Sequence, residues 1–468
     1  MNRPIIIWFR RDLRLSDHEA LSWAAQSGRP IIPVFINDDI VQSLGAAPKW
    51  RLGLAVKKFG ETLGKLGSKL ILRKGDPVKI LADLAGETDA DTVIWSRGYD
   101  AMSVERDKKV KASLIESGLE ARSFAGHLLY EPWHPKTKAG GYFKVYTPFW
   151  RNVSAEYKIT EPLRKVVDFR PYQNAIQTEA LADWELGKEM DRGANVVANF
   201  VRVGEEAALD RLAHFIDEKV DGYREGRDFP EANAVSGLSE NLTYGEISPR
   251  QMYYAGLMAR DAGKMGAEHF LKEITWREFA YHLLWHFPEL DKKEWRAEWA
   301  AFSWRQTGDL PWKQGRTGVA FVDAAMRELY VTGIMHNRLR MIVGSYLTKN
   351  MLIDWRVGMR WFAECLIDWD PAANAMGWQW IAGCGPDAAP YFRIFNPMTQ
   401  ADKFDASAHY RNRFLDVKKS LEARLFYDAC PRSWRLNVKD DVTEPKINLS
   451  QSRKDALLAY EKFKESKP

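Results

Sequence analysis

Cysteine is scarce in this chain. The sequence contains only Cys365, Cys384 and Cys430, and no two of them form a Cys-x-x-Cys pair. They cannot supply the four thiolates of an iron–sulfur cluster or a structural zinc site. An odd, sparse count also argues against the disulfide framework of a secreted domain. We therefore expect a reducing, cytoplasmic setting.

Long apolar runs and an excess of one charge are also absent. No stretch approaches the ~18 apolar residues of a membrane helix, and the first run ends at Arg10, too early for a signal peptide, so no membrane partner is expected. The net charge is only +5, so a polyanionic partner must meet a local basic patch. With 46% hydrophobic and 28% charged residues, the chain is not disordered. Its 468 residues suffice for about three domain-sized units.

The first 130 residues alternate short apolar runs with amphipathic stretches. Residues 4–9, 30–36, 69–72 and 92–95 are predicted strands, and helical spacing follows at 50–66 and 104–117. This order predicts an α/β domain at 1–130 with a doubly wound parallel sheet, whose ligands lie beyond the carboxyl ends of the strands. No Gly-x-Gly-x-x-Gly motif or Walker-type lysine loop is present, so the usual phosphate cradles are excluded.

Two further segments follow. Prolines and the Gly140-Gly141 pair interrupt residues 131–205, which we interpret as a connector. Helical periodicity then dominates, so residues 206–468 are predicted to form a second, mostly α-helical domain. Its predicted helices cover residues 206–219, 249–263, 268–286, 322–333 and 337–350, with a short one near 454–464.

Tryptophan is abundant, with 19 residues, twelve of them after position 270. Aromatic side chains bury much area, so a large helical core explains most of them. On the helix predicted at 268–286, Glu273, Trp276 and Arg277 fall on one face. A solvated face explains the two charges but not the aromatic between them, whereas an unstacked base and its phosphate would suit all three.

Two candidate ligand sites occur on helical stretches. Glu278, His282 and His286 are spaced for a metal but lack the order of a known motif, so no metal is predicted. The run at residues 368–380 combines acids, small residues, one asparagine and several tryptophans. It fits either a buried flat ligand or a tryptophan-rich core helix, and the residues alone leave both open.

Several multi-residue motifs carry a resemblance to a known family. They are Ile7-Trp8-Phe9-Arg10-Arg11-Asp12-Leu13-Arg14, Arg227-Asp228-Phe229-Pro230, Trp276-Arg277-Glu278-Phe279, Gly315-Arg316-Thr317-Gly318, His336-Asn337-Arg338-Leu339-Arg340, residues 368–380, and Arg393-Ile394-Phe395-Asn396-Pro397. In this order, and spread over nearly the whole chain, they resemble the photolyase/cryptochrome family. The resemblance implies an α/β domain, a connector and a helical domain that binds FAD non-covalently in a folded form.

The resemblance assigns residues to FAD. Those near its phosphates and ribityl chain would be Tyr223, Ser236, Leu238 and Ser239, and those near its ring systems Asn337, Arg340, Asp368, Asp370 and Asn374. Arg340 would pair with Asp368, and Asn374 would face flavin N5, as suits a repair enzyme. The phosphate loop at residues 235–239 departs from the family, because relatives often have threonine at its first position and arginine at its third. Backbone amides would then carry more of the phosphate contact.

The resemblance also implies a substrate, ultraviolet-damaged DNA. Glu273, Trp276, Met341 and Trp380 would enclose a flipped pyrimidine dimer, and Arg227, Arg277, Arg338 and Arg393 would grip phosphates. A (6-4) photolyase would carry two adjacent histidines where this chain has His336-Asn337, so the cyclobutane dimer is favoured. The implied activity is that of a deoxyribodipyrimidine photo-lyase acting as a monomer. A cryptochrome-type blue-light photoreceptor is the alternative.

The implied chemistry needs light. An excited, reduced flavin donates an electron to the dimer, the dimer splits and the electron returns. Trp378, Trp355 and Trp304 occupy the positions of the indole chain that re-reduces the flavin in similar proteins. An antenna chromophore is also implied, with methenyltetrahydrofolate favoured and a deazaflavin or FMN as alternatives. The glutamate that contacts folate in relatives aligns with Ser103, and Glu105 could replace it only if the loop shifts.

Overall fold

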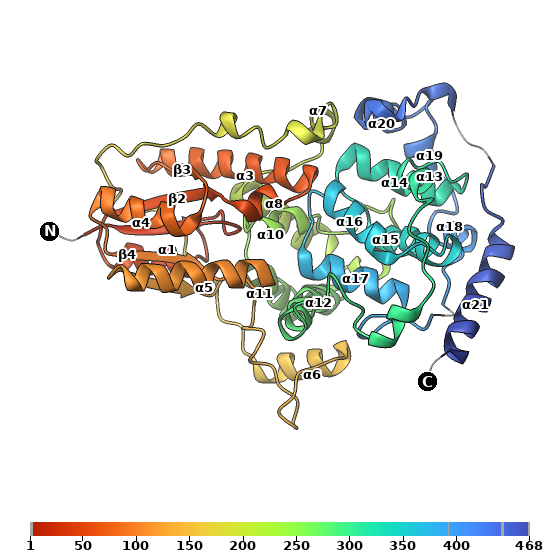
Figure 1. Ribbon diagram of the computed structural model, residues 1–468, viewed down its shortest axis with the longest axis horizontal. Helices are drawn as coiled ribbons and strands as arrows, with labels where there is room; N and C mark the ends of the chain where they lie inside the picture. Colours follow the sequence, from red (N-terminus) through yellow and green to blue (C-terminus); the bar gives the residue numbers. More distant parts are fainter. Residues whose placement is uncertain (1–2, 392, 441–443, 467–468) are drawn as a thin grey trace.

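The computed structural model describes residues 3–391, 393–440 and 444–466. The α/β domain forms one end of an elongated molecule and the helical domain the other, with the C-terminal helix at the far side (Figure 1). A loop with helix α6 (Tyr146–Glu156) projects from the middle.

The N-terminal domain contains one five-stranded sheet. Its strands are β1 (Ile5–Phe9), β2 (Ile31–Asn37), β3 (Ile71–Lys74), β4 (Thr92–Ser96) and β5 (Glu120–Phe124). The order is β3-β2-β1-β4-β5, and every pairing is parallel. The first four strands confirm the predicted runs, whereas β5 was not predicted.

Helices cover both faces of this sheet. Alternate side chains of β1 divide between the two faces, because successive residues of a strand point in opposite directions. Ile5, Ile7 and Phe9 pack with α1 (Glu19–Gln26) and α3 (Ala46–Lys65). Ile6 and Trp8 pack with α4 (Pro77–Thr88) and α5 (Ala101–Glu116). The doubly wound prediction is therefore confirmed.

The connector packs closely on the α/β domain. It runs back along the outside of the sheet to α7 (Gly193–Val197), near the helical domain (Figure 1). Ile31 N–H donates to the carbonyl of Arg170 (2.8 Å), and Leu72 N–H donates to Thr178 Oγ1 (2.8 Å). These hydrogen bonds join the connector to β2 and β3, so this part of the connector packs as part of the α/β domain.

The rest of the chain is helical, as predicted. The helices that build the site are α8 (Glu205–His214), α9 (Tyr223–Gly226), α10 (Ser239–Thr243), α11 (Pro249–Asp261), α12 (Ala267–His286), α14 (Ala320–Thr332), α15 (Asn337–Ser345), α16 (Trp355–Cys365) and α17 (Pro371–Ala382). The remaining α-helices are α2 (Asp39–Gln42), α13 (Leu310–Lys313), α18 (Pro397–Phe404), α19 (His409–Leu415), α20 (Leu421–Ala429) and α21 (Leu449–Glu465). The predicted helices at 206–219 and 337–350 each end in a π-helical turn, Phe215–Lys219 and Tyr346–Asn350.

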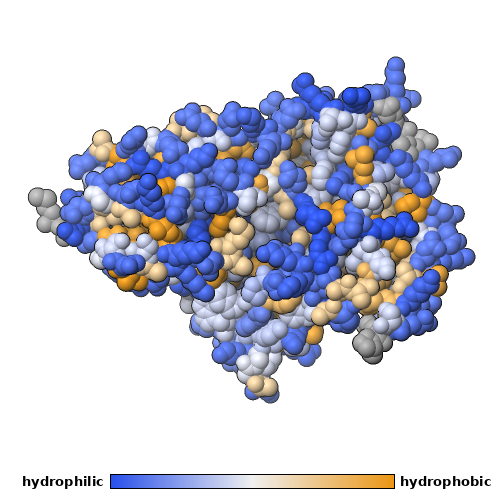
Figure 2. Space-filling view, in the orientation of Figure 1, coloured by the Kyte–Doolittle hydropathy of each residue, from blue (hydrophilic) through white to orange (hydrophobic). Residues whose placement is uncertain are grey.

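The face of the molecule seen in Figure 2 is mostly hydrophilic, with apolar residues in small separate groups. Among the described residues, no helix is both long and apolar enough to cross a membrane.

Candidate functional site

Asp370 caps the helix at the centre of the candidate site. Its Oδ1 accepts hydrogen bonds from the backbone N–H groups of Ala372 (3.1 Å) and Ala373 (2.9 Å), which fixes the start of α17. Its Oδ2 accepts from the hydroxyl of Tyr281 on α12 (2.6 Å). Burial and this carboxylate raise the pKa of Tyr281 well above its ordinary value, so the hydroxyl remains a donor. Asp370 thus ties two helices together at one point.

Asp368 and Arg340 form the ion pair that the sequence predicted. Arg340 Nη2 lies 2.7 Å from Asp368 Oδ2, and Arg340 Nε donates to the carbonyl of Met335 (2.7 Å). Asp368 is only 5% exposed, and its other oxygen, Oδ1, has no hydrogen-bond partner among the described residues. A buried carboxylate oxygen without a donor is costly. This position therefore fits a ligand that brings its own N–H or O–H donor.

Asn374 lies one turn into α17 and is half-buried. Its Nδ2 donates to the carbonyl of Met359 on α16 (3.0 Å). One of the two amide N–H groups is therefore used, and the amide oxygen, to which no described residue donates, can accept a hydrogen bond from a ligand.

The predicted phosphate loop lies beside α8 and α10. Tyr223 is buried near its base, and Ser236 and Ser239 are at least partly accessible. The Leu238 side chain is 1% exposed within the helical core, so only its backbone can meet a ligand. Asn337, predicted near the rings, is exposed at the first position of α15.

The three tryptophans of the predicted electron chain come from adjacent segments. Trp378 and Trp355 are buried, while Trp304 is partly exposed. A Cβ atom at Gly358 would collide with the Trp378 ring, so α16, which begins at Trp355, packs tightly against Trp378. Arg305 N–H donates to the carbonyl of Leu352 (2.7 Å), which fastens the segment of Trp304 beside that of Trp355. The indole nitrogens of all three lack partners among the described residues.

Glu273 and Trp276 lie on the accessible side of α12. The Glu273 carboxylate forms an ion pair with Arg227, whose guanidinium also lies over the ring of Tyr223 (5.5 Å). Trp276 stacks on Tyr146, with ring centroids 3.6 Å apart and planes 8° apart. One face of the indole is therefore covered, and Glu273 already has a cationic partner in the absence of a ligand.

The other predicted DNA contacts lie on α15, α17 and a nearby loop. Arg338 pairs with Asp228 (2.6 Å) and lies over the ring of Phe404 (4.6 Å). Met341 and Trp380 are half-buried at the edge of the helical core, and Arg393 is exposed. The helical domain thus presents several arginines, each of which can exchange an acidic partner or solvent for a phosphate.

Arg277 is an exception among the predicted phosphate contacts. Its Nη1 donates to the carbonyl of His127 (3.0 Å) and contacts Glu278 Oε1 (3.1 Å), and its side chain is only 11% exposed. This position does not support the prediction that Arg277 binds a DNA phosphate, because its guanidinium is bound to the carbonyl of His127 in the α/β domain. Glu278 is itself fully enclosed, and burial raises its pKa to about 7.

Of the two histidines considered for a metal, His282 is engaged elsewhere. His282 Nδ1 donates to the carbonyl of Pro132 (2.8 Å), and its Nε2 accepts from Phe143 N–H (3.0 Å). Both ring nitrogens therefore bind backbone, and burial lowers the pKa of His282 to about 4. No group of three metal-ligating side chains suited to an ion occurs in the described part of the chain.

A cavity of about 360 Å³ lies at the carboxyl ends of β1, β2 and β4, between the two domains. This is the edge of a parallel sheet at which we expect ligands to bind. Its wall includes the side chains of Tyr99, Ser103, Arg106, Trp369 and Asn374. Glu105 does not line it: its carboxylate lies on the exposed face of α5, 3.5 Å from Lys109. The suggestion that Glu105 replaces a folate-binding glutamate is therefore unsupported.

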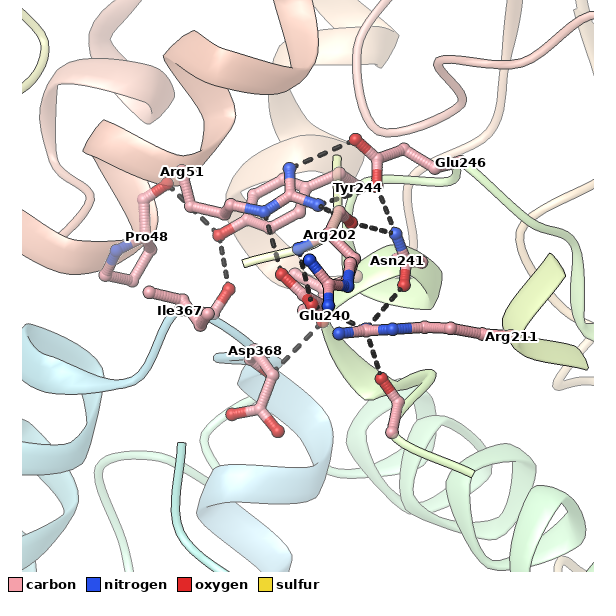
Figure 3. Close-up of polar contacts among 12 residues, drawn as sticks. Pro48, Arg51, Arg202, Arg211, Glu240, Asn241, Tyr244, Glu246, Ile367 and Asp368 are labelled. Atoms are coloured by element: carbon pink, nitrogen blue, oxygen red, sulfur yellow. Dashed lines mark hydrogen bonds and ion pairs between the residues drawn. The ribbon is translucent and has the colours of Figure 1, made fainter. Parts of the chain in front are cut away.

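Sequence reasoning missed a buried charge network between the domains (Figure 3). Arg51 on α3 binds Glu240 through Nε (3.0 Å) and Glu246 through both terminal nitrogens (3.0 and 2.7 Å). Arg211 on α8 approaches Glu240 from the other side (2.5 Å). The hydroxyl of Tyr244 donates to the carbonyl of Ile367 (2.6 Å), directly before Asp368. In the sequence, the only sign of this network is that charged residues occur within stretches of helical spacing.

Comparison with known proteins agrees with this arrangement. Residues 5–168 match the family described as DNA photolyase, and residues 270–462 match the FAD binding domain of DNA photolyase. A deoxyribodipyrimidine photo-lyase of Agrobacterium fabrum is 42% identical, covering 99% of this chain and 98% of its own.

Two solved structures share the fold over nearly the whole chain. The crystal structure of a bacterial class III photolyase from Agrobacterium tumefaciens superposes with a TM-score of 0.91 at 42% identity, covering 100% of this chain and 98% of that one. An archaeal photolyase from Sulfolobus tokodaii, solved with two FAD molecules, has a TM-score of 0.79 at 28% identity, covering 98% and 100%.

A parallel α/β domain joined to a helical FAD-binding domain defines the class as that of two-domain flavoproteins. Within it, the chain belongs to the photolyase/cryptochrome family and is an enzyme of the deoxyribodipyrimidine photo-lyase type.

Proposed function

We propose that this enzyme repairs cyclobutane pyrimidine dimers in DNA, using light and a reduced FAD bound in the helical domain. The observation that carries the proposal is a pair of oxygens near the start of α17 that can accept hydrogen bonds from a ligand. Asp368 keeps a buried oxygen without a donor, and Asn374 turns its amide oxygen away from the Met359 carbonyl that its nitrogen binds. Both suit a ring system that presents N–H groups.

The residues present fit FAD by the chemistry of their donors and acceptors. Arg340 would offset negative charge on a reduced flavin from its position beside Asp368. Asn374, through its amide oxygen, would accept a hydrogen bond from a protonated flavin N5. When bound and excited by blue or near-ultraviolet light, reduced FAD supplies the electron that splits the dimer. The protein positions the two partners and excludes water.

The substrate side follows from the accessible edge of the same domain. Trp276 and Trp380 would contact the apolar faces of a flipped dimer, and Glu273 would hydrogen-bond a base once Arg227 turns to a phosphate. Arg227, Arg338 and Arg393 would bind phosphates around the lesion. Arg227 and Arg338 are already paired with acids, so their contacts with DNA exchange one ion pair for another, whereas exposed Arg393 would form a new one. The affinity is expected to fall with salt, because contacts with phosphates release counterions.

The test is light-dependent loss of dimers. Chemically reduced protein is mixed with irradiated DNA, exposed to blue light or kept dark, and the remaining dimers are counted. We expect loss only in the light, and a Glu273→Ala variant is expected to be about 10-fold or more slower, since it loses a charge-assisted contact to the base. If wild-type protein leaves the dimers intact while its flavin still responds to light, the enzyme does not repair this lesion and a photoreceptor role is favoured.

We further propose that the interdomain cavity binds the antenna chromophore, next to the FAD that Asn374, which also lines the cavity, would contact. Its volume of about 360 Å³ is in the range of small-molecule sites. Tyr99 and Trp369 offer faces for a conjugated ring, and Arg360 lies where an anionic tail could end. Methenyltetrahydrofolate remains the predicted ligand, and a deazaflavin or FMN would use the same features.

Acid extraction of the purified protein tests the antenna. We expect two chromophores, FAD and one other, and the spectrum of the second identifies it. A Ser103→Trp variant, which would fill the wall of the cavity, is expected to release FAD alone, whereas Glu105→Gln is expected to match the wild type because Glu105 faces solvent. Recovery of both chromophores from Ser103→Trp would place the antenna elsewhere.

A further inference from the structure

The phosphate loop contains no cation of its own. Residues 235–239 read Val-Ser-Gly-Leu-Ser, without lysine or arginine. Gly237 has a φ of +66°, and Leu238 N–H is directed back to Ser236 Oγ (3.4 Å). The loop therefore offers amides and two hydroxyls to a ligand that would carry two negative phosphates. From the sequence alone, backbone groups would have to carry this contact.

The tertiary structure brings a guanidinium to the same place. Arg211 reaches from α8, and its Nη1 donates to the carbonyl of Gly237 (2.6 Å), to Glu240 Oε1 (2.5 Å) and to Asn241 Oδ1 (3.0 Å). A Cβ atom at Gly237 would lie 4.0 Å from Arg211 Cζ. The guanidinium thus occupies the side of the loop toward which a side chain at position 237 would point.

Most of the donor capacity of Arg211 is unused. All three of its hydrogen bonds pass through Nη1, and Nε and Nη2 have no partner among the described residues. Neither nitrogen is among the buried atoms that lack a partner, and the side chain is 21% exposed. These N–H groups therefore open toward accessible space beside the loop.

The neighbouring charges leave Arg211 able to bind an anion. Glu240 shares its second oxygen with Arg51, which also takes both oxygens of Glu246. Because the Glu240 carboxylate also binds Arg51, it offsets only part of the positive charge of Arg211. A guanidinium with free donors at a loop of amides is a favourable site for phosphate oxygens.

We propose that Arg211 is an FAD-binding residue that contacts the pyrophosphate and supplies the cation that the phosphate loop lacks. The inference rests on the proposed role of that loop in FAD binding. It adds a residue outside the loop, 24 positions before its first residue, to the set that holds the cofactor.

The experiment measures FAD affinity by titrating apoprotein and following flavin fluorescence. Arg211→Gln keeps a donor for the Gly237 carbonyl but removes the charge. Arg211→Lys keeps the charge but loses the paired, planar N–H donors of the guanidinium. We expect Arg211→Gln to weaken binding by about 10- to 100-fold and Arg211→Lys by less, because charge-assisted hydrogen bonds to phosphate are the strong ones. Arg260→Met, an exposed arginine on α11, is the matched control with wild-type affinity.

Several results would overturn the proposal. Wild-type affinity in Arg211→Gln would show that the charge is not used. Weaker binding in Arg211→Lys than in Arg211→Gln would mean that Arg211 only shapes the loop. Thermal unfolding of each apoprotein identifies any variant that fails to fold. FAD affinities are then compared only among the variants that retain the wild-type unfolding transition. If the wild type binds FAD but does not repair dimers, the proposed function fails while the role of Arg211 stands.

Discussion

Replacing Arg51 with methionine is expected to lower the free energy of unfolding by about 3–5 kcal/mol, because it leaves the buried carboxylate of Glu246 without a counterion and leaves Glu240 with Arg211 alone. The side chains of Arg51, Glu240 and Glu246 are 0%, 0% and 1% exposed. Burial alone would lower the pKa of Arg51, but the charges and hydrogen bonds of Glu246 and Glu240 raise it above its ordinary value. Urea unfolding of the apoprotein measures the loss.

Two further variants make the Arg51 result interpretable. Arg260→Met removes an exposed pair with Asp261 and is expected to change stability by less than about 1 kcal/mol. Adding Glu240→Gln and Glu246→Gln to Arg51→Met should recover much of the loss, since neutral amides cost less to bury than unpaired carboxylates. An unchanged urea midpoint in Arg51→Met would show that the network does not stabilise the contact between α3 and α10.

Replacing Trp378 with phenylalanine is expected to abolish light-driven reduction of oxidised FAD, with a rate at least about 100-fold lower. Phenylalanine keeps most of the packing against Gly358 but lacks the easily oxidised indole. Trp378 Nε1 has no partner among the described residues, so the change removes no hydrogen bond. We therefore expect it to lower the free energy of unfolding by about 1 kcal/mol. Protein that has been reduced chemically should still repair dimers.

Trp312 provides the matched control. Its ring centroid lies 6.2 Å from that of Trp378, and it is completely buried, but it is not in the proposed electron chain. Its Nε1 donates to the carbonyl of Val343 (3.1 Å), so Trp312→Phe should cost more stability than Trp378→Phe. It should nevertheless keep photoreduction, measured by the loss of oxidised-flavin absorbance under blue light. Normal photoreduction in Trp378→Phe would mean that Trp378 only packs in the core and does not carry electrons to the flavin.

Most of the architecture was predictable because it depends on local pattern. Apolar runs located β1 to β4, and helical spacing located α12 and α14 to within a few residues. β5 was missed because its residues, Glu120–Phe124, alternate exposed and partly buried side chains at the edge of the sheet and form no apolar run. The π-helical turns Phe215–Lys219 and Tyr346–Asn350 continue helical spacing, so the sequence could not distinguish them from α-helix.

The candidate site was predictable only in part. The resemblance placed Arg340 and Asp368 together, and the structure forms that pair at 2.7 Å. Helical spacing put Arg277 on the same broad face as Trp276, but the carbonyl of His127, 150 residues away in the sequence, captures its guanidinium. A helical face spans a wide arc, so the neighbour that a long side chain meets depends on the element packed beside it.

The sequence by itself determined the order of strands and helices, the scarcity of cations in the phosphate loop and the positions of the tryptophans. Only the tertiary structure decided which charges meet. Arg51 and Glu246 are 195 residues apart, and Arg211 reaches Gly237 across 26. Local pattern follows from backbone geometry, which neighbouring residues dictate, whereas an ion pair depends on distance in space and on burial, which the packing of the two domains sets.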